Sequence, residues 1–288
     1  MSIVVTGATG SFGRLVVEDL LDRGVPADGI VATGRAVDRL GDLAERGVRV
    51  ARLDYDDLAT AAAVLQADDV LLLVSGSEPG DRVRQHGNVV RAAAEAGVAR
   101  LAYTSILGAG DTSLVLAPEH EATEQVIRDS GVPATLLRNG WYTENYAPSL
   151  QQAAATGVLL GSAGDGRVAS ASRADFATAA ATVLVEPGHE GHAYELSGDV
   201  AWDYDELAAA FAAILGRDVA YQRVDAEQHL AILTGAGLDE GTAGFLVALD
   251  RNTAEGALAR TTGDLARLLG RPTTPLVEAL RPLAPQAG

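Results

Sequence analysis

The sequence contains no cysteine and no lysine, so each of its 22 basic residues is an arginine. Without cysteine there are no disulfides, thiol nucleophiles or thiolate metal sites. Without lysine there is no Schiff-base chemistry, no phosphate-binding lysine of a P-loop and no Tyr-x-x-x-Lys pair of the kind many nicotinamide-dependent reductases use. The longest apolar runs, such as residues 70–74, are far shorter than the about 20 residues that a membrane-spanning helix requires.

Basic residues are also few relative to acidic ones. There are 39 acidic residues, and the formal net charge is -17. A protein of this charge repels nucleic-acid phosphates and anionic lipid, so we expect neither as a partner and no membrane insertion. Residues 1–6 run directly into a glycine-rich turn without the features of a secretory signal, which predicts a cytoplasmic protein.

Short apolar runs alternate with longer amphipathic segments through the first half of the chain. Strands are predicted at 3–6, 29–34, 48–54, 70–75, 100–105 and 134–138, and helices at 14–23, 39–46, 58–66, 83–96 and 119–130. Strands that are apolar along their whole length and alternate with helices are typical of a parallel sheet covered on both faces. The pattern predicts an α/β fold with a Rossmann-like doubly wound parallel sheet.

The rhythm changes after Asn139. Strands are predicted at 157–160, 193–197 and 219–224, helices at 174–184 and 204–215, and the rest is mostly helical. We therefore predict a first domain at 1–150 and a small α/β lobe at 151–288, with part of 165–200 returning to the first domain. This lobe would cover the carboxyl ends of the strands, where open α/β sheets bind their ligands.

The most specific local motif is the glycine turn at residues 6–13, TGATGSFG, between a predicted strand and a predicted helix. Gly7 can make the tight turn, Gly10 allows the backbone to approach a pyrophosphate, and Gly13 allows the helix to pack closely on the strand. A purely structural turn is the alternative. The context favours a nucleotide site whose contacts are Gly7, Thr9, Gly10, Ser11, Phe12 and Gly13.

The end of the second predicted strand indicates which dinucleotide binds. A site for NAD places an acidic residue there, about 20 residues beyond the glycines, to bind the ribose 2′-hydroxyl. This chain has Arg35, whose guanidinium suits the 2′-phosphate of NADP, although a solvated surface arginine is the alternative. NADPH is the predicted cofactor and NADH a second one that the sequence allows. Asp54 and Tyr55 end the third strand, where they could face the adenine.

Several segments together resemble a known family. They are GATGSFG at 7–13, TGR at 33–35, LDYDD at 53–57, YTS at 103–105, LLRNGWYTENY at 136–146 and GDGRVASASRADFA at 164–177. They resemble the NmrA-like branch of the atypical short-chain dehydrogenases/reductases, and within it the bacterial type 2 quinone oxidoreductases and the triphenylmethane reductases. The resemblance covers nearly the whole chain. It implies an NAD(P)-binding Rossmann-like domain, a small C-terminal domain and a cleft between them for cofactor and substrate.

The common short-chain reductases move a proton with Ser, Tyr and Lys, but this chain has no lysine. His120 and Glu124 have the i, i+4 spacing that places both on one helix face, where the Tyr and Lys would be expected. Interconversion of alcohols and ketones is therefore not expected. A quinone needs little proton assistance, because aromatisation drives hydride uptake and the resulting anion is weakly basic, so positioning supplies most of the catalysis.

Individual residues complete the predicted site. His120 is a candidate proton donor or polar clamp, with a surface histidine at a helix start as the alternative. Trp141 and Tyr142 offer flat apolar surface for an aromatic acceptor, although Trp141 could equally pack the domain junction; the amide of Asn145 could bind the acceptor. Further cofactor contacts are predicted at Ser75, Gly76, Tyr103, Thr104, Ser105 and Asn139.

Other polar residues are assigned no part in the chemistry. His86 is predicted to be structural, and Arg82, Arg84 and Arg91 to form a solvated helix face. No metal site is expected, because the remaining histidines lack ligand-like spacing.

The sequence thus predicts an NADPH-dependent oxidoreductase that transfers hydride to a quinone or similar electron-poor aromatic acceptor. Two alternatives stay open: an NmrA-like regulator that binds the dinucleotide without turning it over, and a reductase of triphenylmethane or azo dyes. The sequence does not identify the physiological acceptor. A homodimer is compatible with it but not required by it.

Overall fold

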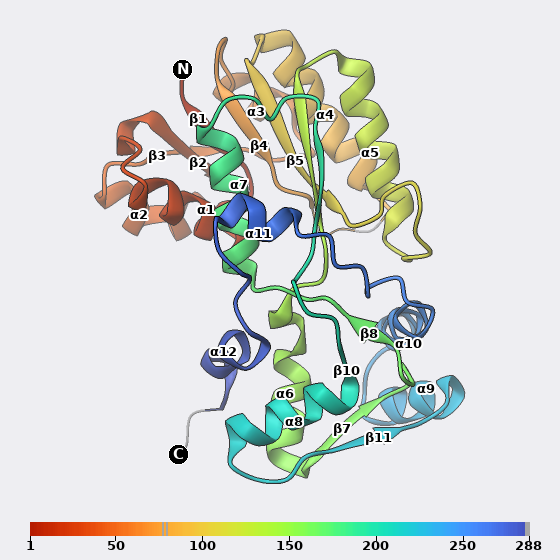
Figure 1. Ribbon diagram of the computed structural model, residues 1–288. Coiled ribbons are helices and arrows are strands. Elements are labelled where there is room, and N and C mark those ends of the chain that lie inside the picture. The colour runs from red at the N-terminus through yellow and green to blue at the C-terminus, as the bar shows by residue number, and fades with distance from the viewer. Residues whose placement is uncertain (77, 79, 286–288) are drawn as a thin grey trace.

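The computed structural model describes residues 1–76, 78 and 80–285, which form a larger and a smaller lobe (Figure 1). The larger lobe is built on a seven-stranded sheet of order β3-β2-β1-β4-β5-β6-β9, in which every neighbouring pair is parallel. Its strands are β1 (Ile3–Val5), β2 (Ile30–Gly34), β3 (Arg49–Arg52), β4 (Val70–Leu73), β5 (Arg100–Ile106), β6 (Ala134–Asn139) and β9 (Ala193–Leu196). The predicted Rossmann-like doubly wound sheet is confirmed.

Helices cover both faces of this sheet. One face packs against α1 (Ser11–Asp22) and α7 (Arg173–Val185), with α11 (Asp264–Leu269) on α7. The other packs against α3 (Leu58–Val64), α4 (Arg82–Ala96) and α5 (Ala117–Ser130). Successive residues of a strand point to opposite faces, so Val4 joins one core cluster and Val5 the other. Burial on both sides explains why the strands read as continuous apolar runs.

The smaller lobe packs around an apolar cluster that includes Leu150, Trp202 and Phe211 and also takes in Ile106 and Ala117 of the larger lobe. Its elements are α6 (Ala147–Thr156), β7 (Val158–Gly161), β8 (Arg167–Val168), β10 (Trp202–Asp203), α8 (Tyr204–Leu215), β11 (Ala220–Arg223), α9 (Ala226–Gly235), α10 (Glu240–Ala254) and α12 (Leu276–Leu280). Strands β7 and β11 pair in parallel with each other, and β8 pairs antiparallel with β10. The strands predicted at 157–160 and 219–224 therefore form a small sheet of their own.

The chain passes between the lobes more than once. It leaves the large sheet after β6, returns for α7 and β9, leaves again for β10 and returns for α11 (Figure 1). These returns place residues from distant parts of the sequence near the carboxyl ends of the strands. Among the helices in the described part of the chain, none combines the length and apolarity needed to span a bilayer.

Element boundaries differ from the prediction by a few residues. Helix α1 begins at Ser11 rather than at residue 14, because Gly10 already serves as its N-cap. The helix predicted at 39–46 is present but shorter, as the five-residue helix α2 (Gly41–Glu45), and a 3-10 turn, η2 (Val37–Leu40), precedes it.

Candidate functional site

A cavity of about 500 Å³ opens at the carboxyl ends of β1, β2 and β4. The order of the sheet reverses between β1 and β4, and this switch point is where doubly wound sheets bind ligands. Eleven residues of the predicted cofactor site line the cavity: Gly7, Thr9, Gly10, Ser11, Phe12, Gly13, Arg35, Asp54, Tyr55, Ser75 and Gly76. The other lining residues carry no predicted role; they are Gly34, Arg39, Leu53, Asp56, Val74, Glu78, Gln85 and Arg173.

The glycine turn forms one wall of the cavity. Gly7 has a φ of +61°, a conformation that favours glycine, and the N–H of Gly10 donates to the Gly7 carbonyl at 2.9 Å. A Cβ on Gly13 would lie 2.6 Å from the carbonyl oxygen of Gly7, so only glycine lets α1 start this close to the strand. The free amides at the start of α1 then face the cavity, and this cradle fits the pyrophosphate of a dinucleotide.

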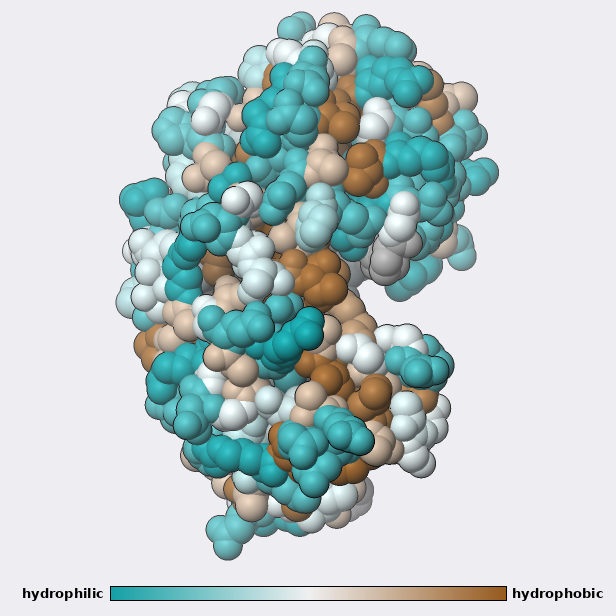
Figure 2. Space-filling view, turned by 90° about the vertical axis from the view of Figure 1, so that its right-hand side faces the viewer, coloured by the Kyte–Doolittle hydropathy of each residue, from teal (hydrophilic) through white to brown (hydrophobic). Residues whose placement is uncertain are grey.

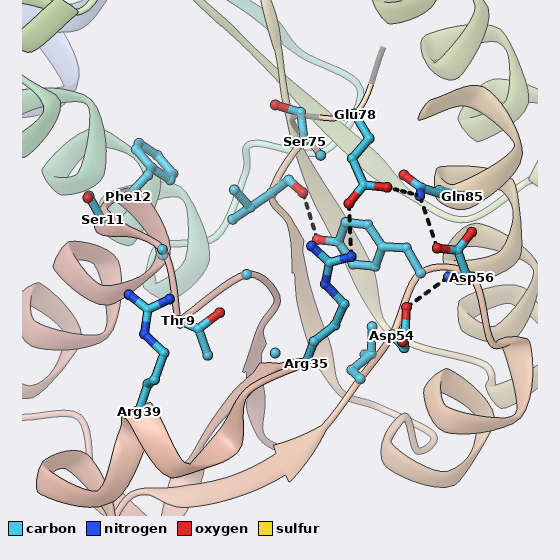
Figure 3. A pocket seen from close by; sticks show the side chains of 18 of the residues that line it. Thr9, Ser11, Phe12, Arg35, Arg39, Asp54, Asp56, Ser75, Glu78 and Gln85 are labelled. Carbon is cyan, nitrogen blue, oxygen red and sulfur yellow. Dashed lines mark hydrogen bonds and ion pairs between the residues drawn. The ribbon is translucent and has the colours of Figure 1, made fainter. Parts of the chain in front are cut away.

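Charged side chains from three elements meet at the far end of the cavity (Figure 3). The guanidinium of Arg35, which follows β2, donates to the Glu78 carboxylate at 2.8 Å, and Gln85 donates to the same carboxylate at 3.0 Å. Hydrogen bonds from Gln85 and Arg35 lower the pKa of Glu78, so this group is ionised. Arg39 lines the cavity on the side of Thr9. Two guanidiniums are thus available to a phosphate at this end.

Tyr55 forms the floor between the glycine turn and β4. Its hydroxyl donates to the Val74 carbonyl at 2.6 Å and lies 2.5 Å from Oγ1 of Thr6. Because the Tyr55 proton points to Val74, the Thr6 hydroxyl donates to the tyrosine oxygen. Burial raises the pKa of Tyr55, so its hydroxyl stays protonated. The ring is therefore fixed by the ends of β1 and β4.

Thr104, buried near the end of β5, does not reach the cavity but holds the backbone of Ser75, which lines it. Its Oγ1 accepts a hydrogen bond from the Ser75 N–H at 2.8 Å. Thr104 itself, with Tyr103, Ser105 and Asn139, does not line the cavity, although all four were predicted as cofactor contacts.

His120 pairs with Tyr103 rather than with solvent. Its Nδ1 lies 2.9 Å from the Tyr103 hydroxyl, and both side chains are buried. Burial, assisted by the nearby charge of Arg82, lowers the pKa of His120 to about 4, so the imidazole is neutral near pH 7. The predicted alternative of a surface histidine is wrong, because α5 turns this face toward the sheet.

Glu124 lies on the same face of α5, as the i, i+4 spacing predicted. Its carboxylate accepts from Ser105 at 2.6 Å and from two nitrogens of Arg138, on β6, at 2.9 and 2.7 Å. Hydrogen bonds and charge from Arg138 and Ser105 outweigh burial and keep the pKa of Glu124 low. Glu124, which the sequence predicts at the place of the lysine, is thus part of an ion pair between α5 and β6.

Tyr142 lies in a stack of rings beside the cavity. Its ring packs parallel to Phe12, with centroids 6.1 Å apart, and edge-on to Phe176. The Arg173 guanidinium lies 5.1 Å from the centre of the Tyr142 ring. Asn139 donates to the Tyr142 hydroxyl at 3.1 Å, and its buried Oδ1 has no partner among the described residues. Arg173 was not singled out because it is remote in sequence from the glycine turn.

Trp141 and Asn145 lie outside this cavity. Trp141 packs, partly buried, against the apolar cluster of the smaller lobe, and Asn145 is exposed within the 3-10 turn η3 (Thr143–Tyr146). Figure 2 shows a hollow between the two lobes with apolar surface in and beside it. On this side of the molecule α10 exposes Phe245 and Leu246.

The prediction of a solvated helix face on α4 is right for two arginines and wrong for the third. Arg84 and Arg91 are exposed, but only 5% of the Arg82 surface is accessible. Arg82 donates to the Gly76 carbonyl at 2.9 Å and to Glu119 at 3.1 Å. A carbonyl and a carboxylate beside the first turn of α4 draw this guanidinium inward.

Comparison with known proteins agrees with this geometry. The family model described as NAD(P)H-binding matches residues 7–187. The chain belongs to this family. It is 46% identical to Escherichia coli quinone oxidoreductase 2 over 278 residues, which cover 96% of this chain and 97% of that protein. It is 29% identical to the NAD(P)H azoreductase of Xenophilus azovorans over 277 residues, 96% of each chain.

Two solved structures are similar over almost their whole length. The Escherichia coli NADPH-dependent quinone oxidoreductase in complex with NADPH superposes with a TM-score of 0.93, covering 98% of this chain and 99% of that one. The Citrobacter sp. triphenylmethane reductase in complex with NADP(H) also gives a TM-score of 0.93 at 37% identity, covering 98% of this chain and 100% of that one. The resemblance to NmrA-like quinone and triphenylmethane reductases is confirmed.

Proposed function

We propose that this protein is an NADPH-dependent oxidoreductase that transfers hydride to a quinone or a similar electron-poor aromatic acceptor. The observation that carries the proposal is the composition of the cavity. A glycine cradle at the start of α1 and two arginines that follow β2, Arg35 and Arg39, line the same cavity. Similarity to an NADPH-dependent quinone oxidoreductase at 46% identity supports the choice of acceptor.

The described residues would each hold a different part of the dinucleotide. The free backbone amides of Ser11 and Phe12 would bind the pyrophosphate, and Arg35 with Arg39 would bind the 2′-phosphate. Arg173 lines the same cavity as the glycine cradle and would add a third positive charge near the phosphates. When bound, NADPH supplies the hydride.

The protein contributes positioning rather than proton transfer. At the place of the Tyr–Lys pair the chain has a neutral His120 bonded to Tyr103 and a Glu124 committed to Arg138. Trp141 and the apolar hollow between the lobes would hold the acceptor ring against the nicotinamide. This arrangement suits an acceptor that takes up hydride readily and does not suit an ordinary ketone.

An assay of NADPH oxidation tests the proposal. The loss of near-ultraviolet absorbance of NADPH is measured with benzoquinones, naphthoquinones, azo dyes, triphenylmethane dyes and ketones as acceptors. Quinone turnover with NADPH supports it. Faster turnover of the dyes than of any quinone would favour the dye reductase, which the similarity to the Citrobacter and Xenophilus enzymes also supports. Tight NADPH binding with no turnover of any acceptor would favour the regulator.

We also propose a cytoplasmic location and a small-molecule substrate, with neither nucleic acid nor lipid as a partner. The net charge of -17 supports the exclusion of phosphate polymers and anionic membranes. A homodimer stays a prediction, and analytical ultracentrifugation tests it.

A further inference from the structure

Both backbone polar groups of Gly76, which lines the cofactor cavity, are held by side chains of α4. The Gly76 N–H donates to Nε2 of His86 at 2.9 Å, and its carbonyl accepts from Nε of Arg82 at 2.9 Å. His86 has no exposed surface. Gly76 is therefore held by buried groups of α4 on one side, while it faces the cavity on the other.

The hydrogen bonds around His86 determine which ring nitrogen carries its proton. A backbone N–H can only donate, so Nε2 must be the acceptor. Nδ1 lies 3.1 Å from Oγ1 of Thr123, whose own proton goes to the Glu119 carbonyl at 2.9 Å. Nδ1 therefore carries the proton and donates it to Thr123. Burial lowers the pKa of His86 to about 3, so the ring stays neutral.

There is little room for the Gly76 backbone to move toward α4. A Cβ on this glycine would lie 3.4 Å from Oε1 of Gln85, 3.7 Å from Nε2 of His86 and 3.8 Å from the Tyr55 ring. The cavity side, by contrast, is open to a ligand. The orientation of the Gly76 backbone is therefore held by two side chains of α4: His86 accepts from its N–H and Arg82 donates to its carbonyl.

We propose that His86 is a positioning residue for the cofactor: as the neutral Nδ1–H tautomer, it orients the Gly76 backbone against the bound dinucleotide. The inference rests on the proposed function, since it assigns this task only to a cavity filled by NADPH. It gives His86, which the sequence indicates only as structural, a defined effect on binding. Replacing it should weaken NADPH binding and leave turnover at saturating NADPH nearly unchanged.

Four variants of the full chain test the proposal, with the dissociation constant of NADPH, and kcat and KM with a benzoquinone, as readouts. His86→Leu leaves the Gly76 N–H unpaired and should raise the NADPH dissociation constant about tenfold. His86→Gln can present an amide oxygen in place of Nε2 and should stay within about threefold of wild type. His229→Gln replaces a buried histidine of the smaller lobe and should change neither the NADPH dissociation constant nor kcat and KM.

Thr123→Val tests the tautomer with a substitution close in shape. It removes the acceptor for Nδ1–H, so the proton can move to Nε2, where it opposes the Gly76 N–H. NADPH binding should weaken by about threefold or more, and long-range ¹H–¹⁵N spectra of the wild type should show His86 protonated at Nδ1. Thr123→Val also decides the matter if His86→Leu does not fold.

Wild-type NADPH affinity in folded His86→Leu, or in folded Thr123→Val, would overturn the proposal, as would a wild-type spectrum with the proton on Nε2. If the wild-type protein binds NADPH and the variants bind it equally well, only the role of His86 is refuted. Wild-type protein that does not bind NADPH defeats the proposed function, and the inference with it.

Discussion

Arg35 meets a carboxylate as well as the space for a phosphate, because Glu78 accepts from its guanidinium at 2.8 Å. Both side chains are largely exposed, at 63% and 45%, so their pairing is weak and a bound phosphate can displace the carboxylate. Positive charge from Arg35 and Arg39 is thus opposed by negative charge from nearby carboxylates such as that of Glu78. The preference for NADPH depends on the two arginines.

Arg35→Glu should raise the dissociation constant of NADPH at least tenfold more than it raises that of NADH. A hydrogen bond to a charged group contributes about 1.5–3 kcal/mol, and the substitution also places an acid beside the 2′-phosphate. Titration of both dinucleotides gives the ratio. Arg91→Glu makes the same charge change on the exposed face of α4 and should leave the ratio unaltered. An equal effect of Arg35→Glu on both cofactors would remove this residue from the site.

Gly10→Val should abolish detectable NADPH binding in a protein that still folds. A Cβ at Gly10 meets only the Gly7 carbonyl, at 3.3 Å, so the backbone can accept it, but the branched side chain occupies the pyrophosphate cradle. Gly41→Val is the matched control, because Gly41 has a helical φ of -57° and open space around it. Circular dichroism checks the fold and cofactor titration checks binding. NADPH affinity kept by folded Gly10→Val would refute the cradle.

Helix α5 carries His120 and Glu124 on the face where the sequence predicts the counterpart of the acid–base pair of the common reductases. His120→Ala should lower quinone turnover by less than about tenfold, because a buried neutral imidazole bonded to Tyr103 is not an essential acid. General acid catalysis contributes about 10²–10⁴-fold, so the two cases are separable. Steady-state kinetics at saturating NADPH measures the effect. A thousandfold loss with NADPH still bound would restore an acid–base mechanism.

The same two helices make the stability of the protein depend on pH. Burial lowers the pKa of His86, on α4, to about 3 and that of His120, on α5, to about 4, from 6.5. Between pH 6.5 and about 4 the unfolded chain binds protons that the folded chain does not, so stability is full above pH 6.5 and falls as the pH decreases. Each histidine contributes at most about 1.4 kcal/mol per pH unit.

Urea denaturation at several pH values should show this decrease, and His86→Gln should make it shallower. The control is His192→Gln, which changes an exposed histidine. An unchanged slope in His86→Gln would mean that His86 is not buried in the neutral form.

Most elements of the large sheet could be predicted from the sequence, because apolar runs such as residues 70–73 are buried on both faces and leave a continuous pattern. The pairing of β7 with β11 could not, since the two strands are distant in sequence and only packing decides their partner. For the same reason the glycine turn and Arg35 could be predicted, being local motifs, whereas Arg173 and the burial of Arg82 depend on tertiary contacts.

At the scale of the whole molecule, the repeated passage of the chain between the lobes joins the cofactor site to the smaller lobe. The segment from Asn139 to Tyr142 leaves the sheet beside the cavity and leads into the apolar cluster that holds Trp141. Helix α7 then returns and brings Arg173 to the cavity. Cofactor and acceptor can therefore be aligned by one continuous stretch of chain. The domain boundary at residue 150 stays a prediction.

The choice of acceptor is decided by the rate of NADPH oxidation by the purified wild-type protein with a benzoquinone, compared with the rate with a simple aliphatic ketone. We expect sustained turnover of the quinone and no turnover of the ketone above the rate without protein, because the site positions hydride transfer and lacks the lysine-assisted proton donor. Reduction of the ketone as efficient as that of the quinone would contradict it.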